Sequence, residues 1–297
     1  MTLYTQAETN IRRTWFFIFF FCLLVIGIGW FFSYLFEAPW LLVFAVILAS
    51  TQSFLSYWYS DKIVLSSVKA QGPLTKEDNP ELYRIVENLS ITAGLPMPRI
   101  YLINDLSPNA FATGRDAQHA VICVTSGLLE KLEKVELEGV ISHELSHIGN
   151  RDILLDSVIV VLVGVISLLA DWFLRGLRYS SRREEDNNAN LLFLLVGIVG
   201  ALLAPLAATL LQLAISRRRE FLADATGALL TRYPEGLARA LEKIAQDPLP
   251  LKSATTATAH LFIADPLKKK QTSWFSKLWL THPPIEERIK ALREMNA

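Results

Sequence analysis

The chain has 297 residues, of which 29 are acidic and 29 basic, so its formal net charge is zero, and 52% of its residues are hydrophobic. A chain without excess positive charge lacks the electrostatic footprint of nucleic-acid binding, so we expect no nucleic-acid partner. The two cysteines, Cys22 and Cys123, support no disulfide framework, which is typical of a protein in a reducing compartment.

Four apolar runs are each long enough to cross a membrane as a helix, because a hydrocarbon core about 30 Å thick requires about 20 residues. The third run carries Asp156 and Asp171, and the other three carry no charge. The runs are Trp15–Phe36, Pro39–Tyr59, Ile153–Leu174 and Leu191–Ser216. The first run is too long and too aromatic at its end for a cleavable signal peptide. We therefore predict about four transmembrane helices, and a buried core helix is the alternative for any single run.

Positive charges beside the first two runs indicate the orientation of the chain. They are Arg12, Arg13, Lys62 and Lys69. Because cytoplasmic loops carry an excess of Lys and Arg, we expect the N-terminus and residues 60–152 in the cytoplasm. Four arginines between residues 175 and 183 disagree with four full spans, so a shallow hairpin over residues 153–216 is an alternative. In either case the chain returns to the same side of the membrane.

The segments outside the membrane predict a mainly α-helical fold with a small β-sheet. The stretch DNPELYRIVENLSITAGLP has apolar residues at helical spacing, with Asn79 and Pro80 at its start and Gly94 near its end. The stretches RIYLIN and HAVICVT predict short strands, with a strand end and a turn between them. From Gly127 onward the pattern predicts one helical stretch that runs into HELSHI.

HELSH matches the H-E-x-x-H pattern. Residues four apart share a helix face, so the imidazoles of His143 and His147 can bind one metal ion. Glu144 lies beside the open coordination position, where its carboxylate can take a proton from water. A surface helix with two chance histidines is the alternative, although a chain with only five histidines makes such a match rare.

A catalytic zinc site takes three protein ligands and leaves one position for water, so a third ligand must come from elsewhere. Asp152 and Asp156 are close in sequence, but Asp152 lies past the helix turn and Asp156 points along the third apolar run. The stronger candidates are in RRREFLADATGALL, directly after the fourth run, where Glu220 and Asp224 share a helix face. Glu220 can bind the metal while Asp224 accepts a hydrogen bond from a ligand histidine. Two ordinary acidic surface residues are the alternative.

Four motifs in this chain, SPNAFATG, HELSHIGNRD, RRREFLADATGALL and THPPIEERIKAL, together resemble the HtpX family of bacterial membrane metalloproteases. That family belongs to the gluzincins and is related to the CAAX prenyl proteases. The resemblance extends from about Thr75 to the C-terminus. It implies a zincin-like domain fused to about four transmembrane helices, with one zinc ion per chain. His143, His147 and Glu220 match the family's zinc ligands, and Glu144 matches its catalytic glutamate.

The same resemblance implies a function. It predicts a multi-pass zinc endopeptidase of the bacterial cytoplasmic (inner) membrane, with its active site facing the cytoplasm. Its partners would be the lipid bilayer and misfolded, surplus or unfolded proteins, cleaved for quality control under stress. The segment NAFATG would form an edge strand that holds the substrate backbone by strand addition. The residues implied are Asn109, Ala110, Phe111, Ala112 and Thr113.

The expected organisation has four parts. Residues 1–59 form two transmembrane helices, 60–152 the first part of the protease domain with the HExxH helix, 153–216 a membrane hairpin, and 217–297 the second part with the third ligand. The alternatives are a non-catalytic membrane adaptor with a structural zinc site, a transporter, a di-iron oxidase and a prenyl-peptide protease. The sequence leaves the oligomeric state, the cleavage preference and the oxyanion donor open.

Overall fold

The computed structural model describes residues 3–35, 37–180, 217–268 and 283–295. Its helices are α1 (Leu3–Leu35), α2 (Trp40–Trp58), α3 (Ser60–Ser67), α4 (Pro80–Ala93), α5 (Ser126–Lys131), α6 (Lys134–Gly149), α7 (Asp152–Ser180), α9 (Arg217–Thr231), α10 (Pro234–Gln246) and α12 (Ile285–Glu294). Its strands are β1 (Arg99–Ile103), β2 (Ala110–Thr113) and β3 (Val121–Thr125). The predicted fold, mainly α-helical with a small sheet, is thus confirmed.

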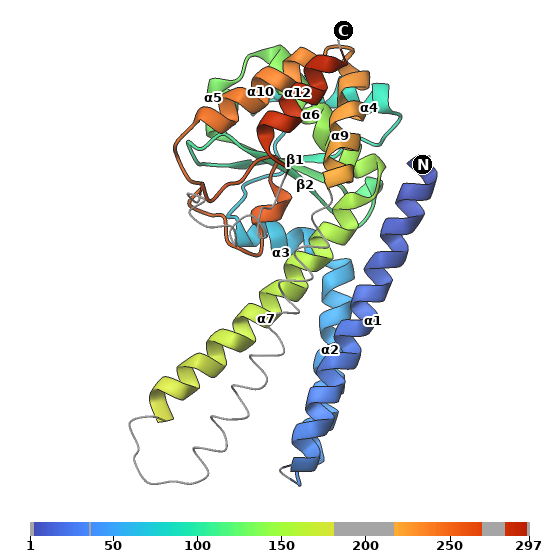
Figure 1. The fold of residues 1–297 in the computed structure, drawn as a ribbon, viewed down its shortest axis with the longest axis vertical. Coiled ribbons are helices and arrows are strands. Elements are labelled where there is room, and N and C mark those ends of the chain that lie inside the picture. Colours follow the sequence, from blue (N-terminus) through green and yellow to red (C-terminus); the bar gives the residue numbers. More distant parts are fainter. Residues whose placement is uncertain (1–2, 36, 181–216, 269–282, 296–297) are drawn as a thin grey trace.

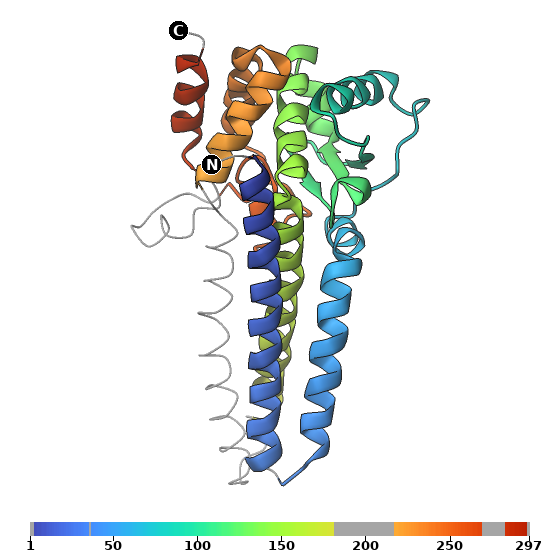
Figure 2. The same ribbon diagram turned by 90° about the vertical axis from the view of Figure 1, so that its right-hand side faces the viewer.

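The long helices α1, α2 and α7 extend from the same side of the globular part, and α7 diverges from the other two (Figure 1, Figure 2). In α1 and α2, the segments Glu8–Leu35 and Trp40–Trp58 are long and apolar enough to cross a membrane, and only 22% of each segment's most apolar stretch is buried. Exposed side chains such as Phe19 and Trp30 suit contact with lipid. The third predicted span corresponds to α7, and the fourth lies outside the described residues.

Helix α1 packs along the first turns of α7. Ile18 and Phe21 of α1 share an apolar cluster with Leu155 and Ile159 of α7. At the end of this contact nearest the globular part, the side-chain amide of Asn10 donates hydrogen bonds to the first residue of α7 and to a backbone carbonyl just before it. The N-terminal membrane helix is therefore joined directly to the segment that follows the HExxH helix.

The globular part is built on a three-stranded sheet of order β1-β3-β2 (Figure 1). Strand β1 pairs with β3 in parallel, and β2 pairs with β3 antiparallel, so β2 is an edge strand. The apolar face of α4 contributes Leu82 and Val86 to the main core. As predicted, Asn79 caps α4, its Oδ1 accepting from the N–H of Leu82 at 3.0 Å, and Gly94 ends it with a φ of 66°.

The predicted helical stretch from Gly127 is divided into α5 and α6. Leu132 and Glu133 adopt extended backbone angles between the two helices. The carboxylate of Glu136 accepts a hydrogen bond from the N–H of Glu133 at 2.8 Å, which stabilises a new helix start, and another from Lys243 of α10 at 2.7 Å. Because of this break, α6 can take a different direction from α5, and the face of α6 that carries the HExxH residues packs against α9.

Candidate metal centre

Helix α6 presents three polar side chains inside the globular part. His143 and Glu144 are 1% exposed, and the side chain of His147 is 15% exposed. The Nε2 atoms of the two histidines lie 3.1 Å apart, with their rings nearly perpendicular at 87°. The i, i+4 spacing thus directs both Nε2 atoms to one point.

Helix α9 brings Glu220 to this point. Its Oε1 lies 3.5 Å from His147 Nε2, and its Oε2 lies 4.0 Å from His143 Nε2. One ligand atom from each of the three residues lies within 4.8 Å of the others. Tetrahedral zinc, with bonds of about 2.0–2.1 Å, separates its ligand atoms by about 3.3 Å, so the donor set fits a single ion of this kind.

The packing of α9 against α6 depends on Gly227. A Cβ atom at this position would lie 3.0 Å from the backbone N of His143 and 3.2 Å from its Cα. The missing side chain lets the two helices approach almost backbone to backbone. Because the contact is with His143 itself, it also fixes how far Glu220 lies from the histidine pair.

A carboxylate holds the second ring nitrogen of each histidine. His143 Nδ1 lies 2.9 Å from Asp224 Oδ1, and His147 Nδ1 lies 2.9 Å from Asp152 Oδ2. Such partners fix the ring orientation and leave Nε2 for a metal ion. Asp224, which the sequence predicts as a partner of a ligand histidine, lies beside His143.

The role of Asp152 was missed from the sequence, which considers this residue only as a possible ligand and sets it aside. Helix α6 ends at Gly149, and Arg151 adopts a φ of 60°, so the chain turns before α7 begins at Asp152. This turn brings the carboxylate back toward His147. The available signal was an aspartate five residues beyond the second histidine, next to a helix end.

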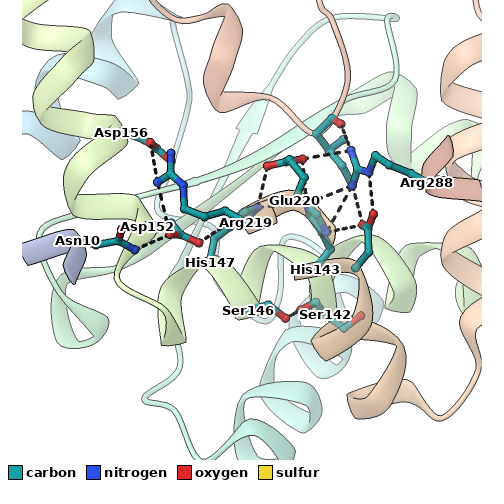
Figure 3. A network of polar contacts seen from close by, with 12 residues as sticks. Asn10, Ser142, His143, Ser146, His147, Asp152, Asp156, Arg219, Glu220 and Arg288 are labelled. Atoms are coloured by element: carbon teal, nitrogen blue, oxygen red, sulfur yellow. Dashed lines mark hydrogen bonds and ion pairs between the residues drawn. The ribbon is translucent and has the colours of Figure 1, made fainter. Parts of the chain in front are cut away.

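Arg288 of α12 is a second residue that sequence reasoning missed. Its guanidinium is fully buried and bonds both oxygens of Asp224, at 2.7 and 2.8 Å, while its Nη1 lies 3.2 Å from Glu220 Oε2 (Figure 3). Burial alone would lower the pKa of Arg288, but the carboxylates of Asp224 and Glu220 outweigh that effect and raise it. Arg288 is in the motif THPPIEERIKAL, but nothing in that motif indicates a buried position.

On the opposite side of the centre, a polar network joins three helices (Figure 3). Asn10 Nδ2 of α1 donates to Asp152 Oδ1 at 2.6 Å and to the carbonyl of Asn150 at 3.1 Å. Arg219 Nη1 of α9 lies 3.4 Å from Asp152 Oδ1 and 3.3 Å from Asp156 Oδ1. The carboxylate that holds His147 is therefore itself held by α1 and α9.

Burial controls the acid–base properties of Glu144. It raises the pKa of this carboxyl to about 7, with the nearby Glu220 adding to the effect and the charge of His147 opposing it. The backbone N–H of Ala112 on β2 faces the Glu144 carboxyl and lowers its pKa. A carboxyl that titrates near neutrality is suited to accept and return a proton.

The surroundings of the two histidines shift their pKa values in opposite directions. Burial lowers the pKa of His143, with Asp224 opposing, which favours a neutral ring. Burial alone would also lower the pKa of His147, but Asp152 and Glu220 outweigh it and raise that pKa to about 9. A metal ion that binds His147 therefore has to displace a proton.

The five predicted substrate-binding residues lie on and before the edge strand β2, and all five are buried. Part of that edge is already occupied. The carbonyl of Ala110 accepts from the N–H of Ile263 at 2.9 Å, and the side-chain amide of Asn109 donates to the carbonyl of Ala264 at 3.0 Å. The residue of β2 whose N–H points toward Glu144 is Ala112.

An H-E-x-x-H helix, a glutamate from a neighbouring helix and two N-terminal helices of membrane length define a membrane metalloprotease of the zincin class. The chain belongs to Peptidase family M48, which it matches over residues 76–296. This membership confirms that the protein is a metalloprotease and that its family binds a metal ion.

Three relatives named Protease HtpX homolog illustrate the similarity. The protein of Caldanaerobacter subterraneus subsp. tengcongensis is 44% identical over 99% of this chain and 98% of its own. That of Thermoanaerobacter pseudethanolicus is 45% identical over the same shares. The protein of Pyrococcus furiosus is 46% identical over 92% of this chain and 91% of its own. The predicted resemblance to HtpX metalloproteases is confirmed.

The fold also resembles a solved structure, the crystal structure of S. mikatae Ste24p. The TM-score is 0.51 and the identity 18%, and the match covers 98% of this chain and 66% of Ste24p. At this identity the similarity concerns the fold alone.

Proposed function

We propose that this metalloprotease is a zinc endopeptidase that cleaves misfolded or surplus membrane proteins at the cytoplasmic face of a bacterial inner membrane. The observation that carries the proposal is the convergence of His143, His147 and Glu220 around one point, with Glu144 beside it. Three ligands leave a fourth coordination position for water, which is typical of a catalytic rather than a structural zinc site.

The proposed roles follow from the contacts of each side chain. His143, His147 and Glu220 would hold the zinc ion, which supplies an acidified water and a polarised scissile carbonyl. Glu144 accepts the proton of the attacking water and returns it to the leaving amine. Asp224 and Asp152 keep the histidine rings oriented through Nδ1.

The position of the centre relative to the membrane helices supports membrane proteins as substrates. The HExxH helix α6 leads into α7 after two residues, and α1 and α9 hold the same Asp152 carboxylate. We propose that residues 60–152 and 217–297 form one protease domain and that 153–216 form a membrane hairpin. The positive charges beside the first two apolar runs support a cytoplasmic position for this domain.

We further propose that substrates bind as an added strand beside β2. The outward N–H of Ala112 and the carboxylate of Glu144 lie next to each other, so a backbone docked at this residue would meet the zinc centre. The contact of Ala110 with Ile263 occupies one end of this edge, so a substrate strand would pair at Ala112, whose N–H faces the Glu144 carboxylate.

The proposal is tested on full-length protein in detergent by measuring bound metals and cleavage of unfolded casein side by side. The variants are Glu144→Gln, Glu220→Ala and, as a matched control, Glu130→Gln on the exposed side of α5. We expect one zinc ion and cleavage for wild type and the control. Glu144→Gln should retain zinc without cleaving, and Glu220→Ala should lose zinc.

Two results would contradict the proposal. Equal zinc in all variants without any cleavage would favour the adaptor with a structural site. Cleavage by Glu144→Gln at the wild-type rate would remove Glu144 from the mechanism. A second arm presents a membrane protein in proteoliposomes with its loops exposed on one side, and the membrane-substrate proposal requires cleavage on the side of the protease domain.

A further inference from the structure

A cavity of about 270 Å³ lies where α2 leaves its apolar run, on residues that take no part in the metal centre. Three aromatic side chains at the end of α2 line it, Phe54, Trp58 and Tyr59. Three cations line it as well, one from α3 and two from the ends of β1 and β2.

The topology of the sheet explains why these cations gather. Strand β1 begins at Arg99, which is in register with Val121 at the start of β3, and Val121 is in register with Thr113 at the end of β2. Arg99 and Arg115 therefore emerge from the same end of the sheet. That end faces the junction of α2 and α3, where Lys62 completes the group.

Contacts with neighbouring side chains hold the two arginines in place. The Arg115 guanidinium lies 4.6 Å from the centre of the Trp58 ring, and one of its nitrogens lies 2.7 Å from His119 Nε2. Arg99 pairs with Asp61 at 2.7 Å. Lys62 is exposed, its Nζ 5.2 Å from the centre of the Tyr59 ring.

The charge of the cavity is complementary to an anion. Lys62, Arg99 and Arg115 line it together with a single carboxylate, that of Asp61. Asp116, which is not a lining residue, adds a second carboxylate 3.5 Å from Arg115 Nε. Three cations against two carboxylates leave an excess of positive charge, concentrated at the exposed Lys62.

The aromatic side of the cavity indicates the depth at which it lies. Phe54 is 54% exposed, Trp58 46% and Tyr59 40%, at the last turn of a helix of membrane length. Trp and Tyr gather at the level of the lipid headgroups, where one end of each ring is apolar and the other wet. In a membrane spanned by α2, these rings would place the cations of the cavity at the depth of lipid phosphates.

We propose that this cavity binds the phosphate-bearing headgroup of an anionic phospholipid, with Lys62 and Arg115 facing the phosphate and the α2 aromatics facing the upper acyl chains. The inference depends on α2 lying in the membrane and does not depend on the zinc endopeptidase proposal. A bound headgroup would fix the end of the sheet, and with it the protease domain, against one leaflet.

The test titrates full-length protein in uncharged detergent with phosphatidylglycerol or phosphatidylcholine of the same acyl chains, with binding measured by native mass spectrometry. We expect wild type to bind phosphatidylglycerol at least about tenfold more tightly, since several basic side chains near a membrane surface each contribute about fivefold. Lys62→Gln and Arg115→Gln should each remove about fivefold of that affinity. Lys76→Gln is the matched control, because Lys76 is also exposed and lies over a tyrosine ring, that of Tyr83, outside the cavity.

Equal binding of the two lipids by wild type would overturn the proposal, as would unchanged phosphatidylglycerol binding by both cavity variants. A further arm adds inorganic phosphate. The lipid proposal is wrong, and the site takes free phosphate, if two results are found together. Phosphate displaces the lipid fully, and Lys62→Gln weakens the binding of phosphate as much as that of phosphatidylglycerol. Should Arg115→Gln fail to fold, Lys62→Gln decides, because this side chain is exposed. Casein cleavage by the variants is measured separately, so this proposal and the protease proposal fail independently.

Discussion

Asp152 shows how one carboxylate can connect the chemistry of the centre to the rest of the molecule. It accepts from Asn10, lies beside Arg219 and holds His147 Nδ1. Its two oxygens have different partners. Oδ2 contacts the histidine, and Oδ1 contacts the side chains from α1 and α9. The orientation of one candidate ligand therefore depends on contacts from two other elements.

We predict that Asp152→Asn weakens zinc binding about 10- to 100-fold, because partners of this kind orient the ligand ring and increase its basicity. A competition titration with a chromophoric chelator measures the affinity. Asp265→Asn, at a carboxylate outside the centre, serves as the control. Unchanged zinc affinity in Asp152→Asn would show that the contact with His147 has no influence on the ligand.

A second residue-scale prediction concerns pH. Partial burial alone would raise the pKa of Asp247, but its contacts with Lys131 and with the N–H of Leu249 outweigh burial and lower the pKa below 3.8. A lowered acid pKa stabilises the fold above the ordinary value, and this stabilisation disappears as pH falls through the lowered pKa. Asp247→Asn should therefore cost about 0.5–1 kcal/mol at pH 7. Thermal melting should show that the difference in stability between Asp247→Asn and wild type becomes smaller from pH 7 to pH 3. A difference that stays constant would contradict a stabilising role of the ionised Asp247 carboxylate.

At the scale of elements, α1 is more than a membrane anchor, because Asn10 joins it to the start of α7. Asn10 is fully buried, and its amide satisfies both Asp152 and the carbonyl of Asn150. The apolar contact of Ile18 and Phe21 with α7 continues this joint along the helices.

We expect Asn10→Ala to destabilise the protein by about 1–3 kcal/mol, because it leaves buried polar groups without this donor. Glu8→Gln, two residues earlier in α1 at an exposed position, is the control and should be neutral. Thermal melting in detergent measures both. The same melting temperature for Asn10→Ala and wild type would mean that α1 docks without this hydrogen bond.

The joint between α6 and α9 gives a second prediction at this scale. Gly227→Ala puts a methyl group 3.0 Å from the backbone of His143, which cannot move aside as a flexible side chain can. We expect a loss of about 1–3 kcal/mol and weaker zinc binding, as α9 and Glu220 are displaced. Gly164→Ala is the control. A Cβ atom at Gly164 would have no heavy atom within 4 Å, so this substitution should be neutral or stabilising. Wild-type stability and zinc binding in Gly227→Ala would show that the helices can separate without cost.

On the scale of the whole molecule, the proposed centre connects parts of the chain that are far apart in sequence. Two ligands come from α6 and the third from α9, on the other side of residues 181–216. Arg288 of α12 adds the C-terminal helix to the same centre. A metal ion bound here would therefore stabilise the packing of all three helices.

Metal removal should consequently lower the stability of the entire globular part. At a zinc concentration about 1,000 times the dissociation constant, the bound ion contributes about 4 kcal/mol. We expect a chelator to lower the melting temperature of wild type and added zinc to restore it, while Glu220→Ala responds to neither. A melting temperature independent of the chelator would show that no ion links these helices.

The sequence by itself determined the features that depend on a few neighbouring residues. Helix α4 is capped by Asn79 at its start and by Gly94 at its end, as predicted, because capping contacts are local. The spacing of His143 and His147, and that of Glu220 and Asp224, put each pair on one face, since helix geometry alone requires it. The motif order was enough to predict the HtpX-like family.

Only the tertiary structure decided which side chains surround those pairs. Arg288 reaches Asp224 across 64 residues, and Asn10 reaches Asp152 across 142. No local spacing encodes such contacts, because they arise when helices pack and buried charges require partners. The turn at Arg151 that brings Asp152 to His147, and the coverage of the β2 edge by Ile263, likewise depend on how the folded chain closes on itself.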